Sequence, residues 1–198
     1  MIKSFSSSAN QTKTLDLDIR NVLAALRRCA PNFETIHCLS FQSVTPKTEQ
    51  EWGAWCETTM RAKFLPVMRD VYTHALEAHV REIMVIDNTL AEECGIHAEK
   101  CCREGRRLLL SQIAPQSERA LQKYLQHVET GKSVAHFVVV YTLRAAVFHI
   151  PLSMVIKSYL FLEATIHARQ SGTHCPEELM EKFYRSSEGA SSKKLRAA

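Results

Sequence analysis

The chain has 198 residues, a length that fits one domain able to bury enough surface to fold without disulfide bonds or metals. Hydrophobic residues make up 45% of it, with only six Gly and six Pro, which is typical of a globular, helix-rich protein. The net charge of +4 includes three basic residues in the last eight, SSKKLRAA, and no Lys/Arg stripe is interleaved with aromatic residues. A basic face that binds nucleic acid is therefore not expected.

The two ends of the chain differ in composition from the rest. Residues 1–13 are rich in Ser, Asn, Gln and Lys and predict a disordered tail. They lack the apolar run of a secretory signal, and the seven cysteines are an odd number, so free thiols in a reducing cytoplasm are expected. Residues 14–186 are expected to form one all-α domain, a bundle of about eight helices, followed by a disordered basic tail at 187–198.

The first predicted helix begins at Leu15, where apolar residues recur at helical spacing, and ends at Pro31. Residues 32–46 follow no regular pattern, so a short strand and a loop both remain open. Thr48 and Glu51 then form a capping box, which predicts the start of a helix that runs to about residue 61.

The next segment, 64–84, has apolar residues at a period of 3.6 and predicts a long amphipathic helix, with a kink at Pro66 as an option. Asp87 or Asn88 is expected to cap the helix that follows, 90–113.

Gly105 lies inside that helix. Because a glycine there costs about 1 kcal/mol relative to alanine, it predicts a close contact between helices.

A further helix is expected between Ser117 and Gly131, and the most apolar stretch of the chain follows. Residues 134–150 predict a helix buried nearly all round, with Ser133 as its N-cap. A buried strand at 138–141 is the alternative, which the 17-residue length disfavours.

Pro151 suits the first turn of a second apolar helix, which Gly172 ends, and residues 175–185 predict a short last helix. No uninterrupted run reaches the roughly 18 apolar residues that a membrane-spanning helix needs.

Two segments resemble the urease accessory protein F family. Residues 136–161, HFVVVYTLRAAVFHIPLSMVIKSYLF, resemble its C-terminal helix pair, with Val138 in place of a proline and Thr142 in place of a glycine. Residues 101–110, CCREGRRLLL, resemble its Ser-x-x-Gln-Gly-x-x-Leu-Leu signature, whereas the family's glycine-rich segment has no counterpart in 31–46. The matching positions are His136, Phe137, Val139, Val140, Tyr141, Ala145, Ala146, Ile150, Leu152, Tyr159 and Leu160 in the first segment and Gly105, Leu108 and Leu109 in the second, where Cys101 and Glu104 take the Ser and Gln positions.

The resemblance implies a non-enzymatic accessory protein of the cytoplasm. Such proteins form homodimers, bind a second urease accessory protein and a nickel-carrying GTPase, and regulate GTP-driven delivery of nickel to apo-urease. No firmly bound cofactor is implied, because the complex handles the nickel, and neither nucleic acid nor a membrane is an expected partner. The candidate partner-binding residues are His136, Tyr141, Arg103, Arg106 and Arg107.

Three residues form the best candidate metal site. Cys94, His97 and Cys101 would share one face of a continuous helix, and thiolate with imidazole is a competent ligand set for Zn²⁺ or Ni²⁺. The alternative is that these cysteines are small hydrophobic residues of the core.

Two other histidine positions have weaker patterns. His136 would lie near the positive end of the central helix dipole, where a neutral imidazole is favoured, and a packed core histidine is the alternative. His74 and His79 are five residues apart and are predicted to lie on different faces, as surface residues.

No motif indicates an active site. The sequence has neither a Gly-x-Ser-x-Gly elbow nor a phosphate-binding loop, and its cysteines fit no recognisable Cys/His motif. Two alternatives to the accessory protein stay open. One is a cofactor-binding all-α enzyme, similar to haem oxygenase, with a ligand among His74, His79, His97 and His136, and the other is a helical protein-interaction adaptor.

Overall fold

The structure is a computed structural model and describes residues 19–36, 48–95, 98–111, 119–172 and 177–180. Within these ranges the protein is all-α: 85% of the residues are helical, eight helices are counted, and there is no strand. The predicted fold class is therefore confirmed, and the alternative of a strand at 138–141 is wrong. None of the described helices is both long enough and apolar enough to cross a membrane.

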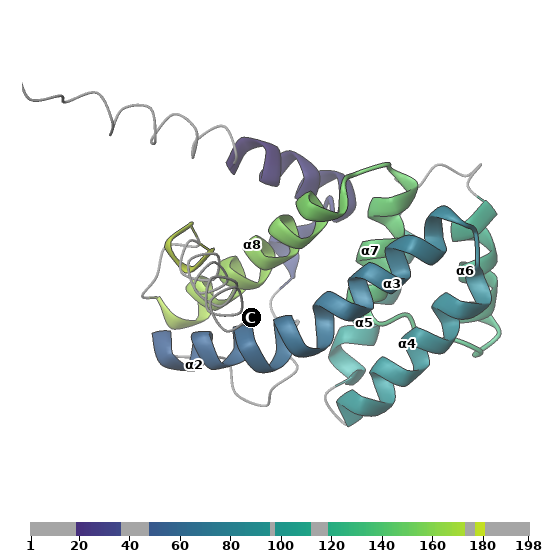
Figure 1. Cartoon of the computed structure of the whole chain (residues 1–198), viewed down its shortest axis with the longest axis horizontal. Helices are drawn as coiled ribbons and strands as arrows, with labels where there is room; N and C mark the ends of the chain where they lie inside the picture. Colours follow the sequence, from purple (N-terminus) through teal and green to yellow (C-terminus); the bar gives the residue numbers. More distant parts are fainter. Residues whose placement is uncertain (1–18, 37–47, 96–97, 112–118, 173–176, 181–198) are drawn as a thin grey trace, which may run out of the picture.

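A long helical rod runs from residue 49 to residue 76 and is composed of α2 (Glu49–Trp55), the π-helical segment η2 (Cys56–Phe64) and α3 (Leu65–Leu76) (Figure 1). The rod starts with the predicted capping box. The Glu51 N–H donates a hydrogen bond to the Thr48 hydroxyl at 3.2 Å, and the Thr48 N–H donates one to the Glu51 carboxylate at 3.1 Å. The rod does not end near residue 61, because η2 joins α2 to α3. At the end of η2 the Leu65 N–H bonds five residues back, to the carbonyl of Met60.

Two predicted helices have the wrong boundaries. The helix expected over 64–84 is broken at residues 77–79, where Ala78 has a φ of 57°, and α4 (Val80–Cys94) starts anew. Gly95, with a φ of 54°, then ends α4, and α5 (Ala98–Leu110) follows. The single helix predicted over 90–113 is therefore wrong, since this range contains the end of α4 and the whole of α5. Asp87 lies inside α4 and caps neither helix.

The second half of the chain follows the prediction more closely. Helix α6 (Arg119–Glu129) ends before Gly131, whose φ is 71°. Helix α7 (Phe137–Val147) begins four residues after Ser133, since residues 133–136 run as a separate segment. Pro151 is the N-cap of α8 (Leu152–Ser171), and Gly172 ends α8 in the left-handed conformation, as predicted.

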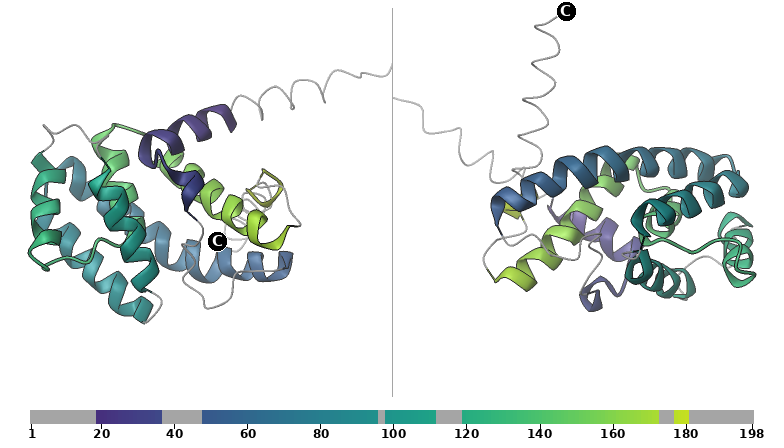
Figure 2. Two further views of the ribbon diagram at one scale, coloured as in Figure 1. Left: turned by 180° about the vertical axis from the view of Figure 1, so that it is seen from behind. Right: turned by 90° about the horizontal axis from the view of Figure 1, so that it is seen from below.

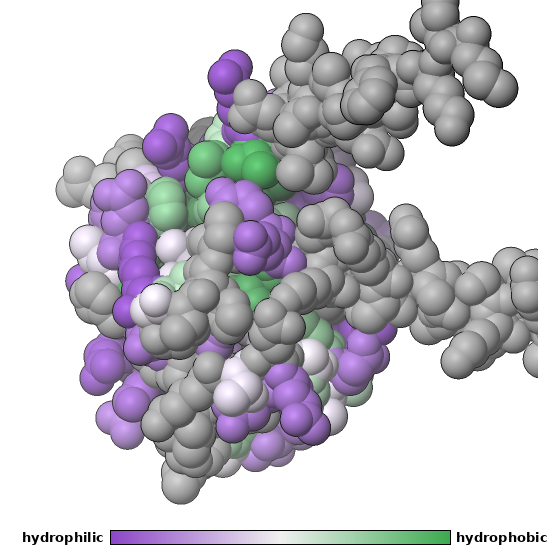
Figure 3. Space-filling view, turned by 90° about the vertical axis from the view of Figure 1, so that its left-hand side faces the viewer, coloured by the Kyte–Doolittle hydropathy of each residue, from purple (hydrophilic) through white to green (hydrophobic). Residues whose placement is uncertain are grey.

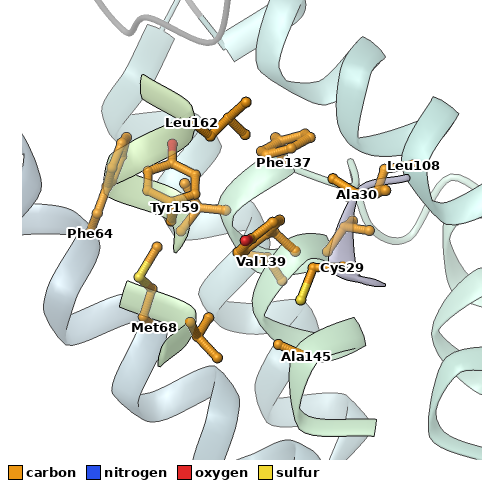
Figure 4. Close-up of a cluster of buried hydrophobic side chains, with 14 of the residues drawn as sticks. Cys29, Ala30, Phe64, Met68, Leu108, Phe137, Val139, Ala145, Tyr159 and Leu162 are labelled. Carbon is orange, nitrogen blue, oxygen red and sulfur yellow. The ribbon is translucent and has the colours of Figure 1, made fainter. Parts of the chain in front are cut away.

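Helix α7 is the centre of the molecule. Ten of its eleven residues are buried, and it packs against α3 on one side and α5 on another, while α8 contacts both α3 and α7 (Figures 1 and 2). The prediction of a helix buried nearly all round is therefore confirmed. The close-up in Figure 4 shows side chains of residues 29–30, η2, α3, α5, α7 and α8 meeting in this core.

The remaining predictions concern the ends and the loops. Residues 19–29 are helical, and η1 (Phe33–Thr35) is a short 3-10 helix in the stretch where strand and loop were both open. Residues 177–180 are helical, within the predicted last helix. Several predicted features lie outside the described residues: both tails, the helix start at Leu15, residues 37–46, the cap at Ser117 and the ligand His97.

Candidate functional site

The two segments that resemble the accessory family meet where the chain enters α7. Gly105 of α5 lies so close to the segment before α7 that a Cβ atom at this position would be 1.9 Å from the Ala135 carbonyl oxygen and 2.9 Å from the Phe137 nitrogen. Only glycine fits such a contact, which confirms the close packing predicted from its position in a helix. The contact is with the segment leading into α7 and with the first residue of that helix.

Asp87 of α4 organises the same place from the other side. Its side chain is buried, and its two carboxylate oxygens accept four hydrogen bonds. The donors are the Ser133 hydroxyl at 2.6 Å and the backbone N–H groups of Val134 at 2.9 Å, Ala135 at 2.8 Å and His136 at 2.7 Å. Asp87 thus satisfies N–H groups that precede α7, at the helix end where a negative charge is favourable. No local sequence pattern indicates a bond from Asp87 to residues 46 to 49 positions away.

Two further side chains hold this segment to its neighbours. The Asn88 amide of α4 donates to the Lys132 carbonyl at 3.0 Å, and the Arg106 guanidinium of α5 donates to the Val134 carbonyl at 3.3 Å. The next residue, Ala135, has a φ of 62°, a conformation that costs a non-glycine residue about 1 kcal/mol or more. The surrounding hydrogen bonds therefore fix the backbone at the start of α7.

His136 is the N-cap residue of α7 and is fully buried, with its Nε2 atom 3.7 Å from the Cys94 sulfur. Burial lowers the pKa of His136 to about 4, so its imidazole is neutral, as the sequence analysis expected for this position. Burial raises the pKa of Cys94 to about 12, so Cys94 remains a thiol, which also bonds to the Leu90 carbonyl. A neutral imidazole beside an unionised thiol is not the ion pair of a cysteine nucleophile.

Tyr141 is buried as completely as His136, and its hydroxyl donates to the Ser158 hydroxyl of α8 at 2.7 Å. Neither side chain lies on the surface of this chain. Both were candidates for partner binding, and in this fold they cannot contact a partner directly. Their roles here are the packing of α7 and its attachment to α8.

The three arginines of α5 are exposed, but they are not an isolated positive patch. The Arg107 guanidinium donates to both Glu104 carboxylate oxygens, at 3.1 and 3.2 Å, and the Arg103 Nε atom is 3.9 Å from the same carboxylate. Arg106 is tied to the segment before α7. This face of α5 therefore offers guanidinium groups arranged around one acidic residue.

The candidate metal site depended on a continuous helix, which the structure does not have. Cys94 ends α4 and Cys101 lies buried in α5, while His97 is outside the described residues. The spacing argument that placed the three residues on one helical face is therefore wrong. In addition, burial holds the pKa of Cys94 far above the range in which a thiolate forms readily at neutral pH.

Sequence reasoning missed another buried polar contact, which lies within α8 and is separate from Asp87 and from the His136–Cys94 contact. The Tyr159 hydroxyl donates to the Glu163 carboxyl at 2.7 Å, and both side chains are buried. Burial raises the pKa of Glu163 to about 7, although the Tyr159 hydrogen bond acts in the opposite direction. A Tyr and a Glu four residues apart, separated by the apolar run Leu160–Leu162, were the signal that could have found them.

Sequence reasoning also missed the arrangement of His74 and His79. Their rings are 5.9 Å apart between centroids, because the break at residues 77–79 turns the chain back. The prediction that they point to different faces assumed one straight helix and is wrong.

A small cavity lies between the turn at residues 30–36 and α5. Its volume is about 90 Å³, and Asn32, Thr35, Glu104 and Arg107 are among the residues that line it. Pockets for cofactors and other small ligands usually span roughly 300–1,000 Å³. This cavity is too small for a haem.

In comparisons with known proteins, no family model, no curated protein and no solved structure matches the chain.

Proposed function

We propose that this chain is a non-enzymatic accessory protein of urease maturation, a scaffold and regulator of the GTPase-dependent complex that delivers nickel to apo-urease. The observation that carries the proposal is the contact between Gly105 and residues 135–137. The two segments that resemble the urease accessory F family are far apart in sequence and pack directly on each other. A chance likeness of two short segments would not require them to form one packed unit.

The core is arranged as a rigid support for surface contacts. Helix α7 is enclosed by α3, α5 and α8, and its first turn is fixed by Asp87 and Gly105, so α5 is held at a defined position relative to the bundle. The exposed side of α5 carries Arg103, Arg106 and Arg107 and ends at Leu110, which is 63% exposed. A rigid helix with guanidinium groups and an apolar end is a suitable contact for an acidic protein partner.

Apolar surface is limited on the rest of the described residues. Figure 3 shows one face on which hydrophilic residues predominate and hydrophobic residues gather in smaller areas. The exposed large hydrophobic side chains of the described residues are Leu76, Val85 and Leu110. We therefore assign binding of the GTPase, the second accessory protein and apo-urease to mixed surfaces such as the exposed side of α5, with homodimerisation and a cytoplasmic location as parts of the same proposal.

The first experiment removes the protein from its host. Deletion should lower urease activity and the nickel content of purified urease, while the amount of urease protein stays the same. Excess nickel in the medium should restore part of the activity, because the proposed defect is in delivery. Normal nickel loading in the deletion strain would reject the proposal.

The second experiment tests the assigned surface. A double variant, Arg103→Glu with Arg107→Glu, should lose co-purification with the GTPase complex, whereas Arg81→Glu, at an exposed arginine of α4, should retain it. Both changes are at exposed positions and should alter the free energy of unfolding by less than about 0.5 kcal/mol per site. Equal binding by both variants would show that α5 is not the docking surface, even if the deletion phenotype is found.

A further inference from the structure

The turn between α3 and α4 brings three side chains with metal-binding atoms together. The His79 Nδ1 atom is 3.0 Å from a Glu77 carboxylate oxygen, and the His74 ring lies 5.9 Å from the His79 ring between centroids. One ligand atom from each of the three residues lies within 4.8 Å of the other two. This cluster lies at the end of a helical hairpin, apart from the start of α7 described above.

The backbone of the turn is what creates the cluster. After Leu76 the helix stops, Ala78 takes a φ of 57°, and the His79 N–H donates to the His74 carbonyl at 2.8 Å. In a continuous helix, residues five apart would point in different directions. The left-handed conformation of Ala78, unfavourable for a residue with a Cβ atom, is therefore the feature that places His79 beside His74.

The state of the three side chains suits an ion that arrives from solvent. Glu77 and His79 are each 54% exposed, so an ion can reach them without any opening of the fold. His74 is half-buried, and its Nδ1 atom has neither solvent contact nor a hydrogen-bond partner among the described residues. A buried polar atom without a partner is unusual, and it leaves His74 with unused coordinating capacity.

We propose that His74, Glu77 and His79 form a surface site for one divalent transition-metal ion of the Zn²⁺ type, with solvent at the remaining coordination positions. Two imidazole nitrogens and one carboxylate oxygen are ligands that Zn²⁺, Ni²⁺ and Cu²⁺ accept, whereas Mg²⁺ and Ca²⁺ prefer oxygen ligands. Ligands about 2.0–2.2 Å from a tetrahedral zinc ion are roughly 3.3 Å apart. The 3.0 Å between Glu77 and His79 is close to this separation, and the side chains would have to rotate to bring the His74 ligand atom closer than its present distance, which is within 4.8 Å.

The site is independent of the proposed role in urease maturation, because it follows only from the geometry of the α3–α4 turn. It predicts a structural consequence as well. A bound ion would join the last residues of α3 to the first residue before α4, and an ion that binds only the folded chain stabilises it.

The test is calorimetric titration of the full-length protein with Zn²⁺, after removal of metals with a chelator. We expect Glu77→Gln and His79→Gln, both at exposed positions, each to weaken Zn²⁺ binding at this site at least tenfold, and His74→Ala to do the same. His127→Ala is the matched control: it removes a half-buried histidine of α6 and should leave binding unchanged. Zn²⁺ should also raise the midpoint of thermal unfolding of the native protein and of the control, and should not raise it in His79→Gln.

Cysteine ligation is separated from this site by Co²⁺ substitution. A site with only nitrogen and oxygen ligands gives no thiolate-to-cobalt charge-transfer band, and the visible absorption of bound Co²⁺ should disappear in His79→Gln. If all three variants bind Zn²⁺ as the native protein does, or if the cobalt spectrum shows thiolate ligation that the variants leave intact, the proposed site is wrong. Neither result bears on the effect of deleting the protein on urease.

Discussion

The core contains two buried carboxyl groups whose surroundings differ. Asp87 accepts four hydrogen bonds, three of them from backbone N–H groups, at the start of α7. Glu163 accepts one hydrogen bond from the described residues, donated by the Tyr159 hydroxyl, and burial raises the pKa of Glu163 to about 7. The two side chains are 0% and 4% exposed. The two carboxyl groups are therefore buried to a similar depth, and they differ in the number of hydrogen-bond donors around them.

The difference in donors follows from where each carboxyl meets the backbone. Residues 134–136 precede a helix, so their N–H groups have no carbonyl partner one turn back and are free to bond Asp87. Glu163 lies in the middle of α8, where backbone N–H groups are already used within the helix. Only a side chain can donate to it there. A helix start thus offers a buried carboxyl group more hydrogen-bond donors than a helix middle does.

The largest effect is expected from Asp87→Asn. The amide has one acceptor oxygen, and its NH₂ group would face donors that now bond a carboxylate oxygen, so several N–H groups would be left buried without partners. We expect the free energy of unfolding to fall by about 4 kcal/mol, as for other broken buried polar networks. Urea unfolding monitored by circular dichroism measures this free energy.

The control for Asp87→Asn is Glu93→Gln, at an exposed position of the same helix, which should change the free energy of unfolding by less than about 0.5 kcal/mol. Similar values for the two variants would refute the role assigned to Asp87.

Gly105→Ala tests the other contact at the start of α7. The new methyl group would collide with the Ala135 carbonyl, which cannot move without disturbing the Asp87 hydrogen bonds. We expect a loss of about 3 kcal/mol in the free energy of unfolding, even though alanine favours the helix over glycine by about 1 kcal/mol.

The matched control for this variant is Gly53→Ala in α2, where nothing lies within 4 Å of the added methyl group. It should stabilise the protein by up to about 1 kcal/mol. The two glycines therefore predict changes of opposite sign, and a stabilising Gly105→Ala would contradict the close packing of the two segments.

These two contacts also show what the sequence could reveal. Gly105 was expected to indicate close packing, because a glycine inside a helix lowers stability unless a close contact requires it. Gly172 and the Thr48–Glu51 capping box were found from local patterns. The helix end at Gly172 and the capping box depend on neighbours in sequence, whereas Gly105 indicated close packing without indicating its partner. Asp87 or Asn88 was expected to cap a helix over 90–113, whereas Asp87 bonds to the segment before α7, because its donors come from residues that only the folded chain brings near.

The break at residues 77–79 escaped prediction for a related reason. Neither glycine nor proline stands there, and Ala78 adopts a positive φ without any local signal. With the break unseen, His74 and His79 were placed on different faces, and the candidate metal cluster could not be found. The break after α4, by contrast, occurs at Gly95, and a glycine is a local signal from which this helix end could have been predicted.

Glu163→Gln should change the pH dependence of stability. Since the pKa of Glu163 is raised from about 4.5 to about 7, the folded protein holds its proton where the unfolded chain has lost it. The stability that protonation of Glu163 contributes to the folded protein is therefore fully present below about pH 4.5 and is lost as pH rises to about 7. The variant lacks this loss, so its stability relative to the native protein should rise by about 3 kcal/mol between these pH values.

The difference between the two proteins is the quantity to measure, by urea unfolding at several pH values. His136, whose pKa burial lowers to about 4, has the opposite effect: its contribution is present above about pH 6.5 and is lost as pH falls toward 4. It acts equally in both proteins and cancels in the difference. A difference that stays constant with pH would mean that Glu163 is not protonated in the folded protein.

The smallest effect is expected from Tyr159→Phe, which removes the hydroxyl that donates to Glu163. The loss of a single buried hydrogen bond should lower the free energy of unfolding by about 1 kcal/mol. Because this bond favours the charged carboxylate, its removal should also move the pH-dependent loss of stability to higher pH. Tyr141→Phe is the control: it removes a buried hydroxyl that donates to Ser158 at the same distance, 2.7 Å, and should cost a similar amount without moving the pH dependence. If both variants leave the pH dependence unchanged, the Tyr159 hydroxyl has no influence on Glu163, and the number of donors does not explain the difference between the two carboxyl groups.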